Sequence, residues 1–330
     1  MSEATDRARG ALAANDNQRA VAIAVAAAQA GDTEAIALLA LWRLTGHPLP
    51  RDLADARRLF GEAADAGDAE AALTEIALLA NGTGGASDWP TALARLALAA
   101  KRFGGEAAKH LTLIERMNLT EAGLPQQVWD PDVIGQQPSI RKWSALLSPD
   151  ECEHLATSVL DLLEPSTVAD PRTGRQIAHP VRRSSAAVVG PTRESLPIQA
   201  ITRRLAAATG TDVRQGEPIA VLHYAPGQEY LPHMDTLPNE RNQRIMTVLI
   251  YLNAGYSGGE THFPANGVNV SGQLGDVIAF DNVLPDGSPD PASRHAGLPI
   301  RRGTKWLATR WIRREPLDIW APRGQTLTPR

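Results

Sequence analysis

The sequence predicts an α+β protein in which an all-α repeat domain precedes a domain of antiparallel strands. Residues 20–119 are rich in Ala and Leu, and their apolar positions recur at spacings of three and four, as in an amphipathic helix. From about residue 181 short β-branched runs are separated by Gly, Pro, Asn and Asp, without helical patterns between them. This second pattern excludes a parallel βαβ sheet and leaves an antiparallel sandwich or a jelly roll.

The composition fits an ordinary globular protein of two domains, with three as the upper bound for 330 residues. Lys and Arg together number 33 and Asp and Glu 37, which gives a net charge of −4. A dedicated nucleic-acid binder would be strongly basic, so we expect no nucleic-acid partner. We also expect no membrane anchor, because no run of about 20 apolar residues occurs.

Neither the cysteine usage nor the amino-terminal residues require an oxidising compartment. Cys152 is the only cysteine, so an intramolecular disulfide and a cysteine-based zinc cluster are both excluded. The first ten residues are polar and do not resemble a signal peptide. We therefore expect a cytoplasmic protein.

The helical half contains an internal repeat. Glu34, Glu70 and Glu106 follow Gly-containing turns and are spaced by 36 residues. A constant period with turns between helices is typical of a helical solenoid and resembles the Sel-like relatives of tetratricopeptide repeats. An Ala-rich helical bundle is the alternative interpretation.

The rest of the chain divides at a segment rich in Gly and Pro. Residues 120–138 are predicted to be a linker, and Ser148 with Glu151 predicts a capping box at the start of a short helix. The clearest strands are residues 219–224, 245–252, 277–280 and 306–312. The predicted domains are a disordered tail (1–19), the repeats (20–119), the linker (120–138), the strand-rich domain (139–316) and a C-terminal tail (317–330).

The residues that indicate chemistry are His233, Asp235, His295 and Lys305. Residues two apart on a strand point to the same side, so His233 and Asp235 can reach one metal ion together. A distant histidine, His295, would complete two imidazoles and one carboxylate, the facial triad of non-heme Fe(II) sites. Taken alone, the His-x-Asp pattern is weak evidence, and an exposed, unligated His233 is the simpler interpretation.

Ordered motifs over the second half resemble the catalytic domain of the prolyl 4-hydroxylase α-subunit family of Fe(II)/2-oxoglutarate dioxygenases. Two of them are YAPGQEYLPHMD, at residues 224–235, and GTKWLATRWI, at 303–312. The others are residues 147–152, 183–185, 243–247, 258–264, 275–280 and 286–297. The resemblance covers residues 139–314 and implies a double-stranded β-helix, which is a jelly-roll barrel, with helices packed outside.

The resemblance also implies roles for individual residues. His233, Asp235 and His295 would bind iron, and Lys305 would pair with the far carboxylate of 2-oxoglutarate. The residues that would assist Lys305 are Tyr224 and Thr261. Those that would line the substrate groove are Arg183, Tyr230, Arg244 and Trp311, although Trp311 could belong to the core and Arg244 could cap the sheet edge. His262 is the one rival metal ligand, but His262 and His223 are expected to face away from the site, because each neighbours a residue that would face inward.

The implied activity is hydroxylation of an unactivated C–H bond, coupled to decarboxylation of 2-oxoglutarate to succinate. The implied cofactors are Fe(II), 2-oxoglutarate and dioxygen, with ascorbate as reductant. The substrate would be a prolyl or related residue of a peptide or protein, and a protein partner could bind the repeats. A free amino acid or small metabolite is the alternative substrate, and a catalytically silent repeat scaffold is the alternative class. All four Tyr lie in the second half, which argues against the Tyr-rich groove of collagen-type enzymes.

Overall fold

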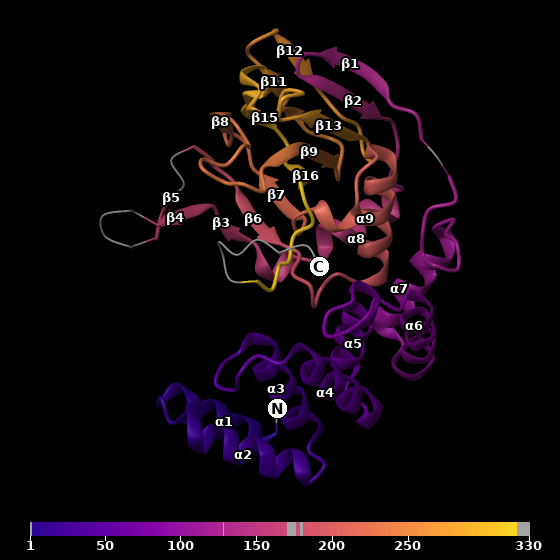
Figure 1. The fold of residues 1–330 in the computed structure, drawn as a ribbon, viewed down its shortest axis with the longest axis vertical. Coiled ribbons are helices and arrows are strands. Elements are labelled where there is room, and N and C mark those ends of the chain that lie inside the picture. Colours follow the sequence, from indigo (N-terminus) through magenta and orange to yellow (C-terminus); the bar gives the residue numbers. More distant parts are fainter. Residues whose placement is uncertain (1, 128, 170–175, 179–180, 322–330) are drawn as a thin grey trace. The chain divides into compact units, whose positions relative to one another are not determined.

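The computed structural model describes residues 2–127, 129–169, 176–178 and 181–321 (Figure 1). These residues form two compact units, Met1–Gln126 with Pro191–Ala200, and Gln127–Gly190 with Ile201–Arg330. Within the described residues, no helix is both long and apolar enough to cross a membrane.

The first unit contains helices that repeat every 36 residues. They are α1 (Glu3–Ala13), α2 (Asn17–Gln29), α3 (Thr33–Thr45), α4 (Leu53–Ala66), α5 (Ala69–Asn81), α6 (Trp89–Phe103) and α7 (Gly105–Arg116). Helices α2, α4 and α6 begin at residues 17, 53 and 89, and helices α3, α5 and α7 begin at 33, 69 and 105. The predicted 36-residue period is therefore confirmed as a repeated pair of helices.

Aspartate caps explain why the helices begin where they do. Asp16, Asp52 and Asp88 cap α2, α4 and α6, and each side chain accepts a hydrogen bond from a backbone N–H in the first turn. Such caps satisfy donors that have no partner within the helix. Gly46 and Gly82 end α3 and α5 in the left-handed region, where glycine is favoured.

The prediction of a disordered tail over residues 1–19 was wrong. Ser2 caps α1 by accepting from the Thr5 backbone N–H, and Ala8 is fully buried. Ala8 joins a core cluster with Ala24 and Trp42. The buried face of α1 consists of alanine and threonine. The sequence of this helix is otherwise polar and therefore shows no strong hydrophobic pattern.

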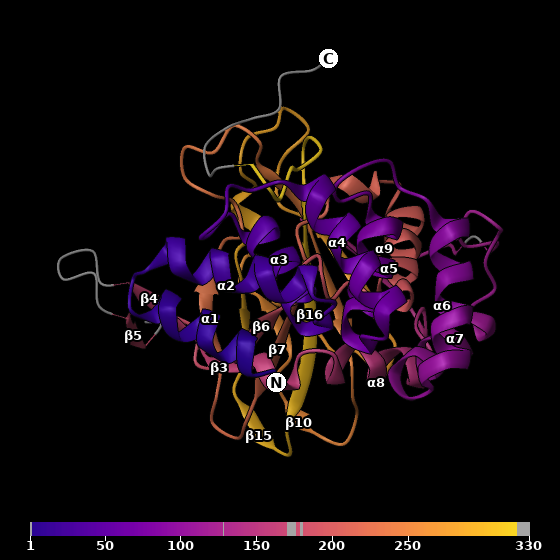
Figure 2. The same cartoon turned by 90° about the horizontal axis from the view of Figure 1, so that it is seen from below.

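The second unit is built around two antiparallel sheets. The eight-stranded sheet has the order β1-β2-β13-β9-β16-β7-β6-β3, and the four-stranded sheet has the order β12-β11-β14-β8. Two smaller pairs are β10 with β15, at one end of this unit (Figure 2), and β4 with β5. The strands of the large sheet are β1 (Asp132–Gln136), β2 (Ser139–Trp143), β3 (Glu164–Pro165), β6 (Ser185–Val188), β7 (Ala220–Tyr224), β9 (Arg244–Tyr251), β13 (Val277–Asp281) and β16 (Lys305–Arg313). The others are β4 (Thr167–Ala169), β5 (Gln176–Ala178), β8 (Tyr230–His233), β10 (Ser257–Gly258), β11 (Thr261–Phe263), β12 (Val268–Val270), β14 (His295–Gly297) and β15 (Ile300–Arg302).

The core of this unit lies between the two sheets. Leu222, Phe280 and Leu307 of the large sheet share one buried cluster with Phe263 and Val270 of the small sheet. Two antiparallel sheets that enclose a common core form the expected double-stranded β-helix.

Among the described residues after the repeats, the remaining elements are two helices and three short 3-10 turns. The helices are α8 (Pro149–Thr157) and α9 (Leu196–Thr209), and the turns are η1 (Leu160–Leu162), η2 (Val213–Gln215) and η3 (Pro291–Ser293). The capping box predicted from Ser148 and Glu151 is present at the start of α8. Arg310 of β16 donates to the backbone oxygen of Thr202 in α9 at 3.1 Å, so α9 covers the outer face of the large sheet there.

The predicted linker over residues 120–138 was wrong in its second half. Strand β1 lies there and pairs with β2 at the edge of the large sheet. Proline and glycine exclude a helix but are tolerated in an edge strand with a bulge, and the register shifts between Val133 and Gly135. The second unit thus begins at Gln127 rather than at residue 139. Most of the predicted C-terminal tail, residues 322–330, lies outside the described residues.

Candidate active site

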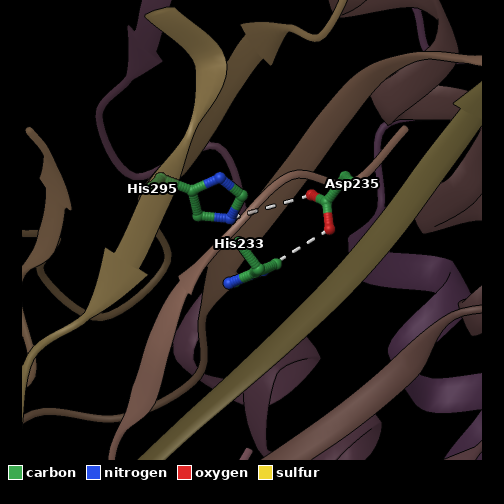
Figure 3. Close-up of side chains that lie close together, drawn as sticks. All are labelled: His233, Asp235 and His295. Atoms are coloured by element: carbon green, nitrogen blue, oxygen red, sulfur yellow. Dashed lines mark ion pairs between the residues drawn. The ribbon is translucent and has the colours of Figure 1, made fainter. Parts of the chain in front are cut away.

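Sheet register brings together the three residues expected to bind metal. His233 is the last residue of β8, Asp235 follows two residues later, and His295 is the first residue of β14. Strands β8 and β14 are paired, with His295 directly opposite His233. One potential ligand atom from each side chain lies within 4.8 Å of the other two (Figure 3).

Both imidazoles are oriented by backbone carbonyls two residues before them. His233 Nδ1 lies 2.9 Å from Leu231 O, and His295 Nδ1 lies 3.0 Å from Ser293 O. A carbonyl oxygen only accepts, so each Nδ1 carries the proton and each Nε2 presents its lone pair. The Nε2 atoms of His233 and His295 face the Asp235 carboxylate at 3.6 and 3.8 Å.

The environment sets the charges that metal binding requires. Burial lowers the pKa of His295 to about 4, so its imidazole is neutral at pH 7. Burial also acts to raise the pKa of Asp235, but the nearby imidazoles of His233 and His295 and the hydrogen bond that Thr247 donates outweigh it and hold that pKa well below its usual range. A neutral imidazole and an ionised carboxylate are the forms that bind metals.

The donor set fits Fe(II). Two imidazoles and one carboxylate form the facial triad of non-heme iron oxygenases, which leaves coordination positions open. Among the residues that the structure describes, these three form the group whose potential ligand atoms lie close enough together to hold one metal ion. Tyr230 stacks on His233 with ring centroids 3.6 Å apart, which further fixes that imidazole.

A buried cation occupies the same cavity. Lys305, the first residue of β16, is 3% exposed, and its Nζ donates to Gly259 O at 2.7 Å. Gly259 has a φ of +72°, a conformation that favours glycine, and a Cβ there would come within 2.4 Å of Ile300 Cδ1. Burial lowers the pKa of Lys305 to about 8. An ammonium group offers three donors, so Lys305 is suited to bind an anion in the cavity.

Two residues with side-chain hydroxyl groups line the same cavity as this lysine. Tyr224 is opposite Lys305 in the β7–β16 register, and its hydroxyl bonds to the side chain of Ser184. Thr261 is 4% exposed and also lines the cavity. The sequence reasoning missed Tyr251, whose ring lies 4.9 Å beneath Lys305 Nζ and whose hydroxyl is 3.5 Å from Thr261 Oγ1. It resembled an ordinary core aromatic in an apolar strand.

The metal triad and Lys305 share one cavity of about 550 Å³, including its open mouth. Tyr230 and Trp311 line it as well, so Trp311 belongs to the cavity wall rather than to the core. His262 and His223 do not line it, as strand alternation predicts. His262 bonds to Asn269, and His223 packs against Trp306.

Arg183 was the wrong arginine. Its side chain is 68% exposed and pairs with Glu229 at 3.9 Å, outside the cavity. Arg182 lines the cavity instead, with its guanidinium 5.8 Å from the Tyr230 ring centroid. An isolated antiparallel β-bridge pairs Arg182 with Tyr230. Two consecutive arginines carry no sequence signal for which of them faces inward.

Arg244 does not line the cavity either. Its guanidinium makes two bonds of 2.6 and 2.7 Å to Glu217 and lies 3.9 Å from the centroid of the Trp311 ring. Arg244 therefore packs on the face of the Trp311 ring, outside the cavity lining, and its place in the substrate groove stays a prediction.

Comparison with known proteins agrees with this geometry. Residues 219–313 match the 2OG-Fe(II) oxygenase superfamily. The jelly roll, the triad and the buried lysine thus define an oxygenase whose cofactors are Fe(II) and 2-oxoglutarate.

Individual relatives place the chain more narrowly. It is 33% identical over 245 residues to a protein from Arabidopsis thaliana named probable prolyl 4-hydroxylase 10, covering 66% of this chain and 84% of that one. The chain belongs to the prolyl 4-hydroxylase family.

A viral collagen prolyl hydroxylase from Paramecium bursaria Chlorella virus-1, solved with 2-oxoglutarate, is 27% identical over 53% of this chain and 95% of its own, with a TM-score of 0.42. A Sel1 repeat protein from Oxalobacter formigenes is 24% identical over 33% of this chain and 85% of its own, with a TM-score of 0.30.

Proposed function

We propose that this protein hydroxylates prolyl residues in peptides or proteins. His233, Asp235 and His295 hold Fe(II), and Lys305 binds the far carboxylate of 2-oxoglutarate with help from Tyr224 and Thr261. The observation that carries the proposal is the presence of the triad and a buried lysine in one cavity. The names of the relatives support the prolyl substrate.

The chain's own residues would orient the reactants. When bound, Fe(II) and 2-oxoglutarate would allow dioxygen to act as the oxidant: one oxygen atom would enter the succinate formed as 2-oxoglutarate loses carbon dioxide, and the other would enter the substrate C–H bond. Lys305 and Tyr224 would fix one end of the co-substrate, because a charge and a hydroxyl together set its direction. Positioning both reactants in a walled cavity keeps the reactive centre away from water.

The substrate side of the cavity carries aromatic rings and a cation. Tyr230 and Trp311 offer flat apolar faces against which a prolyl ring can pack. Arg182 can donate to a peptide carbonyl, since its guanidinium has five N–H groups. These features support a peptide substrate with an apolar ring.

The test is turnover with defined substrates. The protein is incubated with Fe(II), 2-oxoglutarate, oxygen and ascorbate, which we propose as the reductant. Poly(L-proline) and free L-proline are compared by succinate release and by mass spectrometry for the gain of one oxygen atom. The His233→Ala variant is the inactive control.

Each outcome has a distinct meaning. Oxygen gain on poly(L-proline) alone is the expected result. Oxygen gain on free L-proline alone would favour the small-metabolite alternative, and binding of neither iron nor 2-oxoglutarate would favour the silent scaffold. A protein partner at the repeats and a cytoplasmic location stay predictions.

A further inference from the structure

A chain of hydrogen bonds leads to the Asp235 carboxylate from two residues outside the cavity lining. Thr247 Oγ1 lies 2.6 Å from Asp235 Oδ2, and Asn282 Nδ2 lies 2.9 Å from Thr247 Oγ1. Thr247 is on β9, and Asn282 directly follows the neighbouring strand β13. All three side chains are at least 95% buried.

The direction of donation along this chain is fixed by chemistry. An ionised carboxylate only accepts, so the Thr247 hydroxyl must donate its proton to Asp235. The hydroxyl oxygen then has only lone pairs to offer to Asn282. Asn282 must therefore turn its NH₂ group, and not its oxygen, toward Thr247.

The amide oxygen of Asn282 supports this reading. Asn282 Oδ1 is buried and has no hydrogen-bond partner among the atoms of the described residues. A buried polar atom without a partner destabilises the fold, so stability alone does not explain this side chain. A leucine would fill a comparable volume without an unpaired polar atom. What the amide contributes is the hydrogen bond that it donates to Thr247.

We propose that Thr247 and Asn282 are positioning residues that hold the Asp235 carboxylate in one orientation for metal binding. The inference deepens the proposed function and rests on its assignment of Asp235 as an iron ligand. A carboxylate that must bind metal beside two fixed imidazoles benefits from restricted rotation. Loss of such an outer hydrogen bond typically weakens metal binding by roughly 10–100-fold.

The experiment measures metal affinity rather than turnover. Co(II), which needs no exclusion of oxygen, is titrated calorimetrically into the full-length protein and its variants. Thr247→Val removes the hydroxyl and keeps the shape, and we expect roughly 10–100-fold weaker binding. Thr247→Ser restores the hydroxyl and should bind Co(II) nearly as tightly as the wild type.

The matched control is another buried threonine on the same unit. Thr209 donates to Leu205 O within α9, outside the cavity lining, so Thr209→Val should leave Co(II) affinity unchanged. Circular dichroism checks that each variant is folded. If Thr247→Val does not fold, the hydrogen-bond chain is still tested by comparing the Co(II) affinity of Thr247→Ser, which keeps the hydroxyl, with that of Asn282→Ala, which removes the donor to it.

A double-mutant cycle tests whether Asn282 acts through Thr247. Asn282→Ala should weaken Co(II) binding less than Thr247→Val does, and the double variant should be no weaker than Thr247→Val alone. Folded Thr247→Val with wild-type Co(II) affinity would overturn the inference, as would strictly additive losses. The His233→Ala variant distinguishes failure of this inference from failure of the proposed iron site. Unchanged Co(II) binding in that variant would refute the iron site itself.

Discussion

Replacement of Lys305 by alanine should weaken 2-oxoglutarate binding while leaving metal binding intact. Lys305 Nζ is buried, and in the described part of the chain its one hydrogen bond goes to Gly259 O. The far carboxylate of 2-oxoglutarate would enter a partly desolvated pocket and lose its ammonium partner in the variant. Lys305 is not a metal ligand in the proposed triad, so Co(II) affinity should not change.

The expected magnitude follows from the burial of this charge. Removing one partner of a buried, hydrogen-bonded charge pair costs about 2–5 kcal/mol. Because the cavity has an open mouth, we expect the lower part of this range, about 3 kcal/mol or roughly a 150-fold increase in KM for 2-oxoglutarate. Tyr224→Phe removes one hydrogen bond to a charged group, about 1.5–3 kcal/mol, and should have the smaller effect.

The pKa of Lys305 adds a pH signature. Burial lowers this pKa to about 8 in the free protein. A bound carboxylate stabilises the ammonium form, so binding is pH-independent below about 8 and weakens as the pH rises above it. Lys305→Arg stays charged throughout and should lose this pH dependence, although its longer, planar group should restore affinity only in part.

The assay is succinate release as a function of 2-oxoglutarate concentration at several pH values, with Co(II) titrated separately. Equal KM values for wild type and Lys305→Ala would refute the assignment. Arg301 and Arg302 would then be the candidates for the anchor. Against them stands the observation that Arg301 is 72% exposed and pairs with Glu260 at 3.1 Å.

Three further predictions concern the metal ligands, the substrate arginine and the repeats. His233→Ala should abolish coupled turnover while His262→Ala retains it, as measured by succinate release; the opposite pattern would mean that the wrong histidine is assigned. Arg182→Ala should raise KM for a peptide substrate about tenfold, the effect of roughly one hydrogen bond, whereas Arg183→Ala should leave it unchanged. Asp68→Ala removes a cap that accepts two backbone N–H bonds of 2.9 Å and should lower stability by about 1 kcal/mol in urea unfolding; an unchanged midpoint would contradict this.

The metal site was predictable from sequence only in part. The spacing of two predicts His233 and Asp235 on one side of a strand, and the structure brings them together although β8 ends at His233. The spacing cannot place His295, which lies 60 residues further on and is brought opposite His233 by the pairing of β8 with β14. That pairing depends on the tertiary fold, so the residues alone made His295 only a candidate, and the family resemblance implied its role as the third ligand.

The wrong and missed predictions have different physical causes. Helix α1 and strand β1 bury little apolar surface, so their sequences lack the hydrophobic periodicity from which elements are recognised. Arg182 and Arg183 differ only in register, and a shift of one residue reverses which of them faces the cavity. Thr247 and Asn282 gave no signal, because an isolated threonine or asparagine says nothing about what its side chain bonds.

Strand β16 shows how one element can serve both ends of the site. Lys305, Leu307, Thr309 and Trp311 alternate along it and all line the cavity. Six residues of strand span about 20 Å, which separates the proposed co-substrate anchor from the Trp311 side chain at the substrate side. Arg310, between them, faces outward and donates to backbone oxygens of Thr202 and Val213, which fixes the strand against its surroundings. The distance between the two binding functions is therefore set by a rigid strand rather than by loops, so changes in the substrate loops can alter substrate choice without moving Lys305.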